Sequence, residues 1–449
     1  MYKKYLTFEE LINAFRMRDG IAIRCCDADG VVSEVSYKEF GEMIISESFL
    51  AKAACSTVEV VRYEQNMESL VDIFSYVIAG CDVIIADPRV PEGFNESAAE
   101  AAEAARQFRE SRRDEYGRLM GKQGEGELLF FTSGTTSRSK IVRLTSKSLC
   151  ASAWNGQSML PCGEDDVILS NLSLSHAYGF VCSMLWGLAY GATVALGRDL
   201  HRFTGDALFF KPTILPAVPI QIADMLKADA LNPELRCVLI GGTTCPKTII
   251  DQLKERGIDL YIGYGLTETS SGIAITQDLD EPEALYPCPE ADIRLEEDGE
   301  ITVATTCMMQ GYIGDQPMLD NDRFFTGDLG WFDEKGRLHL KGRKKDILLL
   351  DDGTKIFCPE FEEDLERMSG LPDIGIILKD GKAVLIAGSL TNNPAIEAEI
   401  RGKLLKTIKE YNSGLPGSQH LHDVIVTADS LPRTITGKLK RYELQEWFN

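Results

Sequence analysis

The chain has 449 residues, 44% of them hydrophobic and 8% aromatic, which is ample for large apolar cores and excludes global disorder. The formal net charge of −22 argues against nucleic acid or an anionic membrane surface as a partner, because both repel a strongly acidic protein. The length suggests roughly two to four folding units.

Cysteine usage and the first residues indicate the compartment. The twelve cysteines, including the pair Cys25 and Cys26, show no Cys-x-x-Cys spacing, so neither a disulfide scaffold nor a metal framework is expected. Residues 1–17 mix charged and apolar side chains in an amphipathic pattern, and no segment has the length and hydrophobicity of a signal peptide or membrane span. We therefore expect a cytoplasmic protein with reduced thiols.

The N-terminal part alternates helical patterns with short apolar runs. Between Thr7 and Ala79 these elements follow one another, and Val83–Ala86 predicts a buried strand. The stretch Glu96–Lys122 is rich in Ala, Glu and Arg, which predicts an exposed helix followed by a polar loop.

A strand followed by a loop of small residues occupies the centre of this pattern. Leu128–Phe131 is a continuous apolar run, typical of a strand buried in a parallel sheet. Backbone N–H groups and hydroxyls of the next segment can face a polyanion, with Lys140 as a point charge. The segment contains Thr132, Ser133, Gly134, Thr135 and Thr136. A serine-rich surface loop is the alternative.

This loop is not the common nucleotide-binding P-loop. That pattern requires Gly, four residues, then Gly-Lys-Ser/Thr. Counted from Gly134, Ser139 stands where the second glycine is needed and Ile141 where the Mg²⁺-binding hydroxyl is needed. An ordinary P-loop kinase or GTPase is therefore disfavoured.

Strands and helices alternate after the loop. The pattern predicts a mixed sheet covered by helices, with ligands at the carboxyl ends of its strands. The apolar runs are Val167–Leu169, Thr193–Ala195, Thr213–Leu215 and Val238–Ile240, with a helix near Tyr178–Tyr190. Short runs separated by acidic turns after Ala291 predict a β-rich subdomain, and the α+β pattern returns past Lys345.

Several polar residues stand at predicted strand ends. His176, Tyr178 and Gly179 follow one strand. Tyr264 follows another and could stack on a purine, while Glu268 could hold Mg²⁺ against phosphate oxygens. Farther on, Asp328 lies in a Thr-Gly-Asp turn, where a carboxylate can accept two hydrogen bonds. Near the C-terminus, Lys438 follows a glycine in a proline-bounded loop that could carry an ammonium into a cleft.

Taken together, these stretches resemble the adenylate-forming superfamily, which contains acyl-CoA synthetases, peptide-synthetase adenylation domains and luciferases. The resemblance extends from Thr132 to Arg441. The loop 132–140 departs from the family pattern at Ser137 and Ser139, where the family has Gly and Pro, and losing a glycine restricts access to positive φ.

The resemblance implies a fold of two domains. Residues 1–344 would form a large AMP-binding domain of layered α/β subdomains plus a β-rich subdomain. Residues 345–449 would form a small, mobile α+β domain that carries the catalytic lysine. The Gly342–Asp346 stretch resembles the family hinge, with Lys345 at the pivot.

The resemblance also assigns roles to individual residues. Thr132–Thr136 and Lys140 would hold the β- and γ-phosphates of ATP, Glu268 would bind Mg²⁺, and Lys438 would bridge the substrate carboxylate and the α-phosphate. Tyr264, Gly265 and Thr267 would contact adenine and the α-phosphate, and Asp328 and Arg343 would contact the ribose. Gly241 and Gly242 would form walls of the adenine and acyl pockets. The acid pocket would contain His176, Tyr178, Gly179 and Ala217.

The activity implied is ATP-dependent activation of a carboxylic acid to acyl-AMP and pyrophosphate, followed by thioester formation with CoA. An aryl or fatty acid is expected. An α-amino acid is disfavoured because the segment 171–188 contains no Asp to pair with a substrate ammonium. Two alternatives stay open: a ligase that loads a separate phosphopantetheinyl carrier protein, and a non-catalytic nucleotide-binding relative, motivated by Ser137 and Ser139.

His420 and His422 have no third ligand nearby in the sequence, so a surface position is expected for them rather than a metal site.

Overall fold

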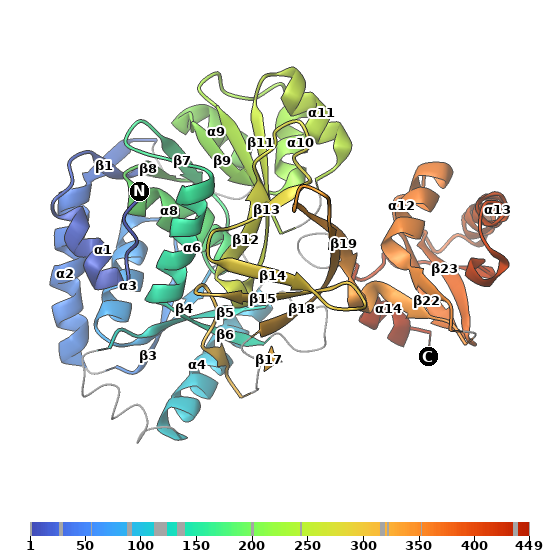
Figure 1. The fold of residues 1–449 in the computed structure, drawn as a ribbon, viewed down its shortest axis with the longest axis horizontal. Helices are drawn as coiled ribbons and strands as arrows, with labels where there is room; N and C mark the ends of the chain where they lie inside the picture. Colours follow the sequence, from blue (N-terminus) through green and yellow to red (C-terminus); the bar gives the residue numbers. More distant parts are fainter. Residues whose placement is uncertain are drawn as a thin grey trace.

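The computed structural model describes residues 2–26, 30–54, 56–87, 92–111, 124–132, 140–198, 202–242, 245–314, 319–320, 323–351, 353–433 and 439–448. Figure 1 shows a large α/β part and a smaller part at the C-terminal end of the chain. Within the described ranges no helix combines the length and hydrophobicity needed to cross a membrane.

The larger sheet has two halves. One half is mainly parallel and contains, in spatial order, β11 (Asp259–Leu266), β10 (Cys237–Gly241), β9 (Ile214–Ala217), β7 (Val167–Ser170), β8 (Thr193–Leu196), β1 (Ile21–Cys26) and the antiparallel β2 (Val32–Ser36). Its helices are α1 (Phe8–Phe15), α2 (Tyr37–Ala54), α6 (Ser146–Met159), α7 (Ala177–Phe180), α8 (Trp186–Tyr190), α9 (Phe203–Phe210), α10 (Pro219–Lys227) and α11 (Lys247–Glu255). This confirms the predicted alternation of strands and helices.

The other half of the sheet is the predicted β-rich region. It continues from β11 through antiparallel strands, and in β14 buried residues alternate with more exposed ones. Its strands are β12 (Ser271–Thr276), β13 (Leu285–Pro287), β14 (Ala291–Leu295), β15 (Glu300–Thr305), β17 (Leu319–Asp320), β18 (Arg323–Phe332) and β19 (Leu338–Arg343).

The second sheet carries the loop of small residues. Its order is β16 (Gly311–Tyr312), β6 (Ile141–Thr145), β5 (Glu127–Phe131), β4 (Asp82–Ala86) and β3 (Val58–Arg62), with helices α3 (Met67–Ile78) and α4 (Glu92–Ser111) beside it. The parallel environment predicted for β5 is only half right. It runs parallel to β4 but antiparallel to β6, so the loop 132–140 joins two hairpin strands.

Helix α4 is not the exposed helix that its composition predicts. Ala98, Ala101, Ala102 and Ala105 are buried, and they recur at the spacing of one helical face. They pack in one cluster with Ile84 and other side chains of the second sheet. These four residues form an apolar face on the helix, so alanine serves here as a core residue.

The C-terminal part has its own core. It contains β20 (Ile347–Leu349), β21 (Lys355–Phe357), α12 (Cys358–Ser369), β22 (Ile374–Lys379), β23 (Lys382–Gly388), α13 (Pro394–Asn412), β24 (Asp423–Thr427) and α14 (Arg441–Glu446). Its buried apolar residues, from Leu350 onward, cluster separately from those that end at Leu338.

Candidate active site

The parallel strands β7, β9, β10 and β11 bring several predicted site residues to one edge of the sheet. Ala217, Gly241 and the segment Tyr264–Glu268 lie at the carboxyl ends of their strands, because all four strands run the same way. Gly242, with a φ of 79°, follows β10, and Thr267 begins a short 3₁₀ turn, Thr267–Thr269. His176 and Gly179 lie just beyond β7.

The two ends of the predicted phosphate loop are held together. The backbone N–H of Thr132 donates to the Lys140 carbonyl at 2.9 Å, and the N–H of Lys140 donates to Thr132 Oγ1 at 3.1 Å. Ser133, Gly134, Thr135 and Thr136 lie outside the described residues. The described flanks therefore fix where this loop starts and ends.

Tyr312 connects Lys140 to Glu268. Its hydroxyl donates to Glu268 Oε1 at 2.7 Å, and Lys140 Nζ lies 4.6 Å from the centroid of its ring. Tyr312 stands on β16, which pairs with β6 immediately after Lys140. The structure thus brings the lysine and the predicted metal-binding carboxylate to one phenol ring.

Glu268 has the chemistry expected of a magnesium ligand. One oxygen accepts a hydrogen bond from a neutral donor, and a carboxylate has further lone pairs for a cation. Mg²⁺ is commonly held by one or two carboxylates together with phosphate oxygens and water. Glu268 is a single carboxylate, and in the described parts of the chain no group of three or more His, Cys, Asp or Glu able to hold a metal occurs.

A second cluster joins Tyr264, Asp328 and Arg343. The Tyr264 hydroxyl donates to Asp328 Oδ2 at 2.9 Å, and Arg343 Nε lies 2.7 Å from Asp328 Oδ1. Burial raises the pKa of Tyr264 well above its usual value, and the Asp328 charge adds to this effect. Asp328 is therefore oriented by two donors and retains lone pairs for further hydrogen bonds.

The glycine in this turn is required by close backbone approach. A Cβ at Gly265 would lie 1.8 Å from the carbonyl oxygen of Ser271 on the adjacent strand β12. Any side chain there would force β11 and β12 apart, which would displace Tyr264 and Glu268 on either side.

The predicted acid pocket centres on Tyr178. Its hydroxyl donates to the Leu239 carbonyl of β10 at 2.7 Å and lies 3.3 Å from the Ala217 carbonyl of β9. Burial raises its pKa well above the usual value and keeps it neutral. Burial also lowers the pKa of His176, although the Asp87 carboxylate opposes the shift. Gly179 packs against the backbone of the preceding turn, where a Cβ would lie 2.2 Å from the Ser173 carbonyl oxygen.

Replacing Gly241 with alanine is expected to lower the free energy of unfolding by about 1–3 kcal/mol, the usual cost of overpacking. The new Cβ would lie 2.8 Å from the Tyr178 ring, which its hydrogen bond holds in place. Chemical denaturation measures the loss. The control is Gly263→Ala on the adjacent strand, where a Cβ meets nothing closer than 3.9 Å; an equal loss in both variants would contradict the tight contact at Gly241.

The charged residues on either side of Lys345 form ion pairs with different parts of the chain. On one side, Lys344 forms ion pairs with Asp298 and Glu300 at 2.7 and 2.6 Å, and these carboxylates raise its pKa. On the other side, Asp346 pairs with Arg441 of α14 at 3.3 Å. Lys345 therefore lies between a residue that pairs with the β-rich region and a residue that pairs with the C-terminal part.

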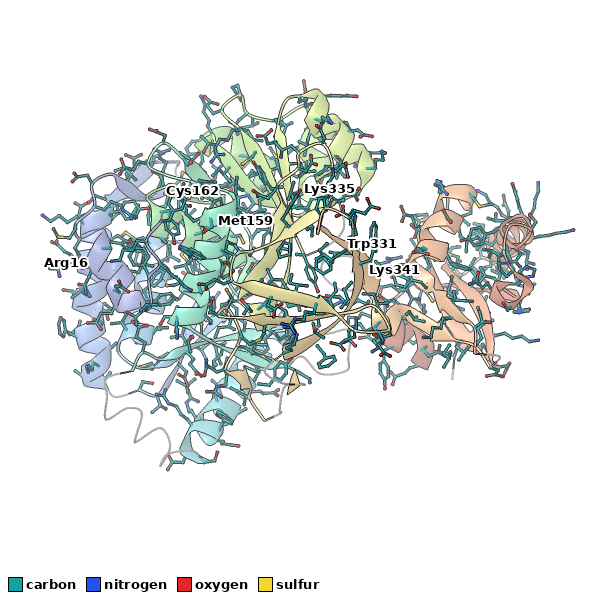
Figure 2. The ribbon with its side chains drawn as sticks, viewed as in Figure 1. Arg16, Met159, Cys162, Trp331, Lys335 and Lys341 are labelled. Carbon is teal, nitrogen blue, oxygen red and sulfur yellow. The ribbon has the colours of Figure 1, made fainter. Side chains whose placement is uncertain are left out.

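The strand before this stretch lies close to the C-terminal part. Figure 2 shows Trp331 and Lys341 on the side of the large part from which the small part extends. The Trp331 ring stacks on His339 at 4.1 Å, and Lys341 Nζ lies 5.9 Å from the Phe357 ring centroid. A Cβ at Gly342, whose φ is 138°, would lie 2.1 Å from that phenylalanine ring, so glycine permits the close approach.

Lys438 lies outside the described residues, but the flanks of its loop are described. Arg433 and Leu439 form an isolated antiparallel bridge, and the N–H of Lys440 donates to the Pro432 carbonyl at 2.7 Å. Arg433 also pairs with Asp373 at 3.1 Å. The loop that carries Lys438 is thus closed at its base and attached to the small sheet.

Sequence analysis did not identify Tyr312 as a site residue. Its strand is only two residues long, too short for a periodic pattern, and its partner Glu268 lies 44 positions away. The signal available was a Gly-Tyr pair between Gln310 and Ile313, which is weak.

The whole chain is similar to several known proteins. A model of the AMP-binding enzyme family matches residues 48–313. The 2-succinylbenzoate–CoA ligase of Oceanobacillus iheyensis is 27% identical over 339 residues, covering 70% of this chain and 68% of the relative. That of Listeria monocytogenes serotype 4b is 29% identical over 336 residues, covering 71% and 69%.

Solved structures show the same fold. The o-succinylbenzoate CoA synthetase (MenE) of Bacillus subtilis, in complex with the acyl-adenylate intermediate, has a TM-score of 0.76 at 21% identity and covers 97% of each chain. ATP-bound MatB from Rhodopseudomonas palustris has a TM-score of 0.77 at 20% identity and covers 98% of this chain and 99% of its own. Because the family model covers more than half of the sequence, this chain belongs to the AMP-binding enzyme family.

Proposed function

We propose that this protein is an AMP-forming acid–thiol ligase, which activates a carboxylic acid with ATP and transfers the acyl group to CoA. The observation that carries the proposal is the connection of Lys140 and Glu268 through Tyr312, together with the carboxylate Asp328 that Tyr264 and Arg343 orient. A cation for phosphates, a carboxylate for Mg²⁺ and an acceptor for ribose hydroxyls are the groups that ATP needs. The named ligase activity of the relatives supports the same reaction.

In the first step, a carboxylate oxygen of the acid attacks the α-phosphorus and pyrophosphate leaves, giving acyl-AMP. Lys140 holds the departing phosphates, Asp328 fixes the ribose, and Lys438 offsets the negative charge that builds between carboxylate and phosphate. Glu268 would hold Mg²⁺, which would neutralise phosphate charge. In the second step, the CoA thiolate attacks the acyl carbonyl and AMP leaves.

The division of the chain into residues 1–344 and 345–449 is part of this proposal. Separate apolar clusters on the two sides, and ion pairs that change partner at Lys345, support it. Rotation about Lys345 would withdraw Lys438 after pyrophosphate leaves and open the site to the thiol.

The acid is proposed to be aromatic. Tyr178, Ala217 and Gly241 give a pocket wall with a neutral phenol and small side chains, which suits a flat, largely apolar group. The relatives make 2-succinylbenzoate the first acid to test.

Pyrophosphate exchange into ATP with a panel of acids tests the proposal. The panel contains 2-succinylbenzoate, benzoates and fatty acids. Acid-dependent exchange is expected with at least one aryl acid, and CoA is expected to release AMP more efficiently than a phosphopantetheinylated carrier protein. Absence of exchange with every acid, despite ATP binding, would identify a nucleotide-binding relative without ligase activity.

We also propose a cytoplasmic location. Several described cysteines are free thiols, as is usual in a reducing compartment: Cys150, Cys162, Cys182, Cys237, Cys245, Cys288, Cys307 and Cys358.

Replacing Glu268 with glutamine is expected to raise the Mg²⁺ concentration needed for half-maximal pyrophosphate exchange by about tenfold or more, because a neutral amide is a poorer ligand for a hard cation. Tyr312 can still donate to the amide oxygen, so the local fold should persist. Exchange is measured across a Mg²⁺ series. The control is Glu296→Gln, which removes a carboxylate on the β-rich side, bonded to Thr302; unaltered Mg²⁺ dependence in Glu268→Gln would remove the metal role.

A further inference from the structure

We infer that Tyr312 is a positioning residue, one that holds the phosphate-binding lysine and the metal-binding carboxylate apart and in place. The inference rests on the proposed function, because it concerns how ATP and Mg²⁺ are bound. Tyr312 contacts both groups, but at different parts of its side chain: the hydroxyl meets Glu268 and the ring face meets Lys140.

The segment around Tyr312 is tied to both sites by its backbone. The N–H of Met309 donates to the Glu268 carbonyl at 2.8 Å. The N–H groups of Gln310 and Ile313 donate to the carbonyls of Arg143 and Ile141 on β6, at 2.9 and 3.0 Å. Residues 309–313 thus connect the turn that contains Glu268 to β6, the strand that follows the phosphate loop.

The ring separates two opposite charges that would otherwise attract each other. Among the described contacts no ion pair joins Lys140 to Glu268, and the Lys140 ammonium lies 4.6 Å from the centroid of the Tyr312 ring. A direct ion pair would occupy the lysine needed for phosphate and the carboxylate needed for Mg²⁺. The attraction of a ring face for an ammonium is weak at an exposed site, so it holds Lys140 without competing strongly with a polyphosphate.

The hydroxyl has a different effect. As a neutral donor it orients Glu268 through Oε1 while leaving the negative charge of the carboxylate intact. Groups that orient a metal ligand in this way typically change metal affinity by about 10- to 100-fold when removed. Burial of Tyr312, which is 7% exposed, keeps water from replacing this bond.

Two substitutions separate the two effects. Tyr312→Phe removes the hydroxyl and keeps the ring, so the affinity for ATP in EDTA should stay unchanged. The Mg²⁺ concentration at which the change in ATP affinity is half complete should rise about tenfold. Tyr312→Leu also removes the ring, so ATP affinity in EDTA should fall by about two- to fivefold as well. Isothermal titration of ATP, in EDTA and across a Mg²⁺ series, measures both without turnover.

Tyr411→Phe is the matched control. The Tyr411 hydroxyl also donates to a carboxylate, Asp364, at 3.1 Å, but both residues lie in the C-terminal part. A merely structural role for Tyr312 predicts that Tyr312→Phe loses thermal stability and keeps the wild-type Mg²⁺ midpoint, a result that would overturn the inference. Wild-type protein that binds no ATP with or without Mg²⁺ would refute the proposed function and this inference together.

Discussion

Replacing Lys438 with alanine is expected to slow the formation of acyl-AMP by roughly 100- to 1,000-fold, the range typical for losing one preplaced charge-stabilising group. The ammonium is proposed to face the carboxylate and the α-phosphate, where charge develops only in the first step. The second step needs that group elsewhere, because the thiol must enter. Thiolysis of a supplied acyl-AMP should therefore proceed near the wild-type rate.

The two half-reactions are measured separately, by pyrophosphate exchange and by AMP release from synthetic acyl-AMP with CoA. Lys440→Ala serves as the control, since Lys440 Nζ pairs with Glu443 on the first turn of α14. It should retain both half-reactions, because its N–H still donates to the Pro432 carbonyl. Equal loss of both steps in Lys438→Ala would refute the assignment of Lys438.

The parallel half of the larger sheet could be predicted from sequence because its strands are buried on both faces. Val167–Ser170 and Cys237–Gly241 are nearly continuous apolar runs, and each is followed by a helix, which is the pattern of parallel strands. The residues that follow such strands must meet at one edge. Gly241 and Tyr264 follow this rule, since they lie near the carboxyl ends of the neighbouring strands β10 and β11.

The same reasoning failed for the neighbours of β5. An apolar run shows that Glu127–Phe131 is buried, but not in which direction the next strand runs. The antiparallel β6 depends on the length and closure of the loop between them, where Thr132 and Lys140 exchange hydrogen bonds. Composition failed similarly for α4, because alanine is a weak hydrophobic signal and its buried spacing was hidden among charged residues.

Long-range polar contacts were the least predictable. The sequence could suggest that Asp328 and Glu268 bind ATP and its metal. It could not show that Tyr264 and Arg343 orient Asp328, or that Tyr312 orients Glu268. Such contacts join strands far apart in the chain, and no local pattern encodes them. The roles of these residues stay predictions until ATP binding is measured.

Replacing Arg441 with methionine is expected to lower the free energy of unfolding of the C-terminal part by about 3–5 kcal/mol, the usual cost of breaking a buried ion pair from one side. Arg441 is 8% exposed and binds both oxygens of Glu362, at 2.7 and 2.9 Å. It also donates to the Ile376 carbonyl at 2.7 Å. Methionine fills similar space but leaves the Glu362 charge without its bidentate partner.

Denaturant unfolding measures the loss, with Arg401→Met as the control. Arg401 pairs with Asp423 at 2.8 Å, but both side chains are about half exposed, so its loss should cost no more than about 1 kcal/mol. Adding Glu362→Leu to Arg441→Met should recover much of the stability, because an apolar pair can replace a buried ion pair. Failure of the double variant to recover would show that the other contacts of Arg441, with the Ile376 carbonyl and with Asp346, carry the effect rather than the pair with Glu362.

The position of Arg441 makes this loss functional as well. It begins α14 just after the loop that carries Lys438, and it reaches Asp346 beside the proposed hinge. Loosening it should therefore reduce acyl-AMP formation together with stability. Lys438→Ala should reduce acyl-AMP formation while the unfolding free energy stays unchanged, so the two variants distinguish loss of the ammonium from loss of the structure that places it.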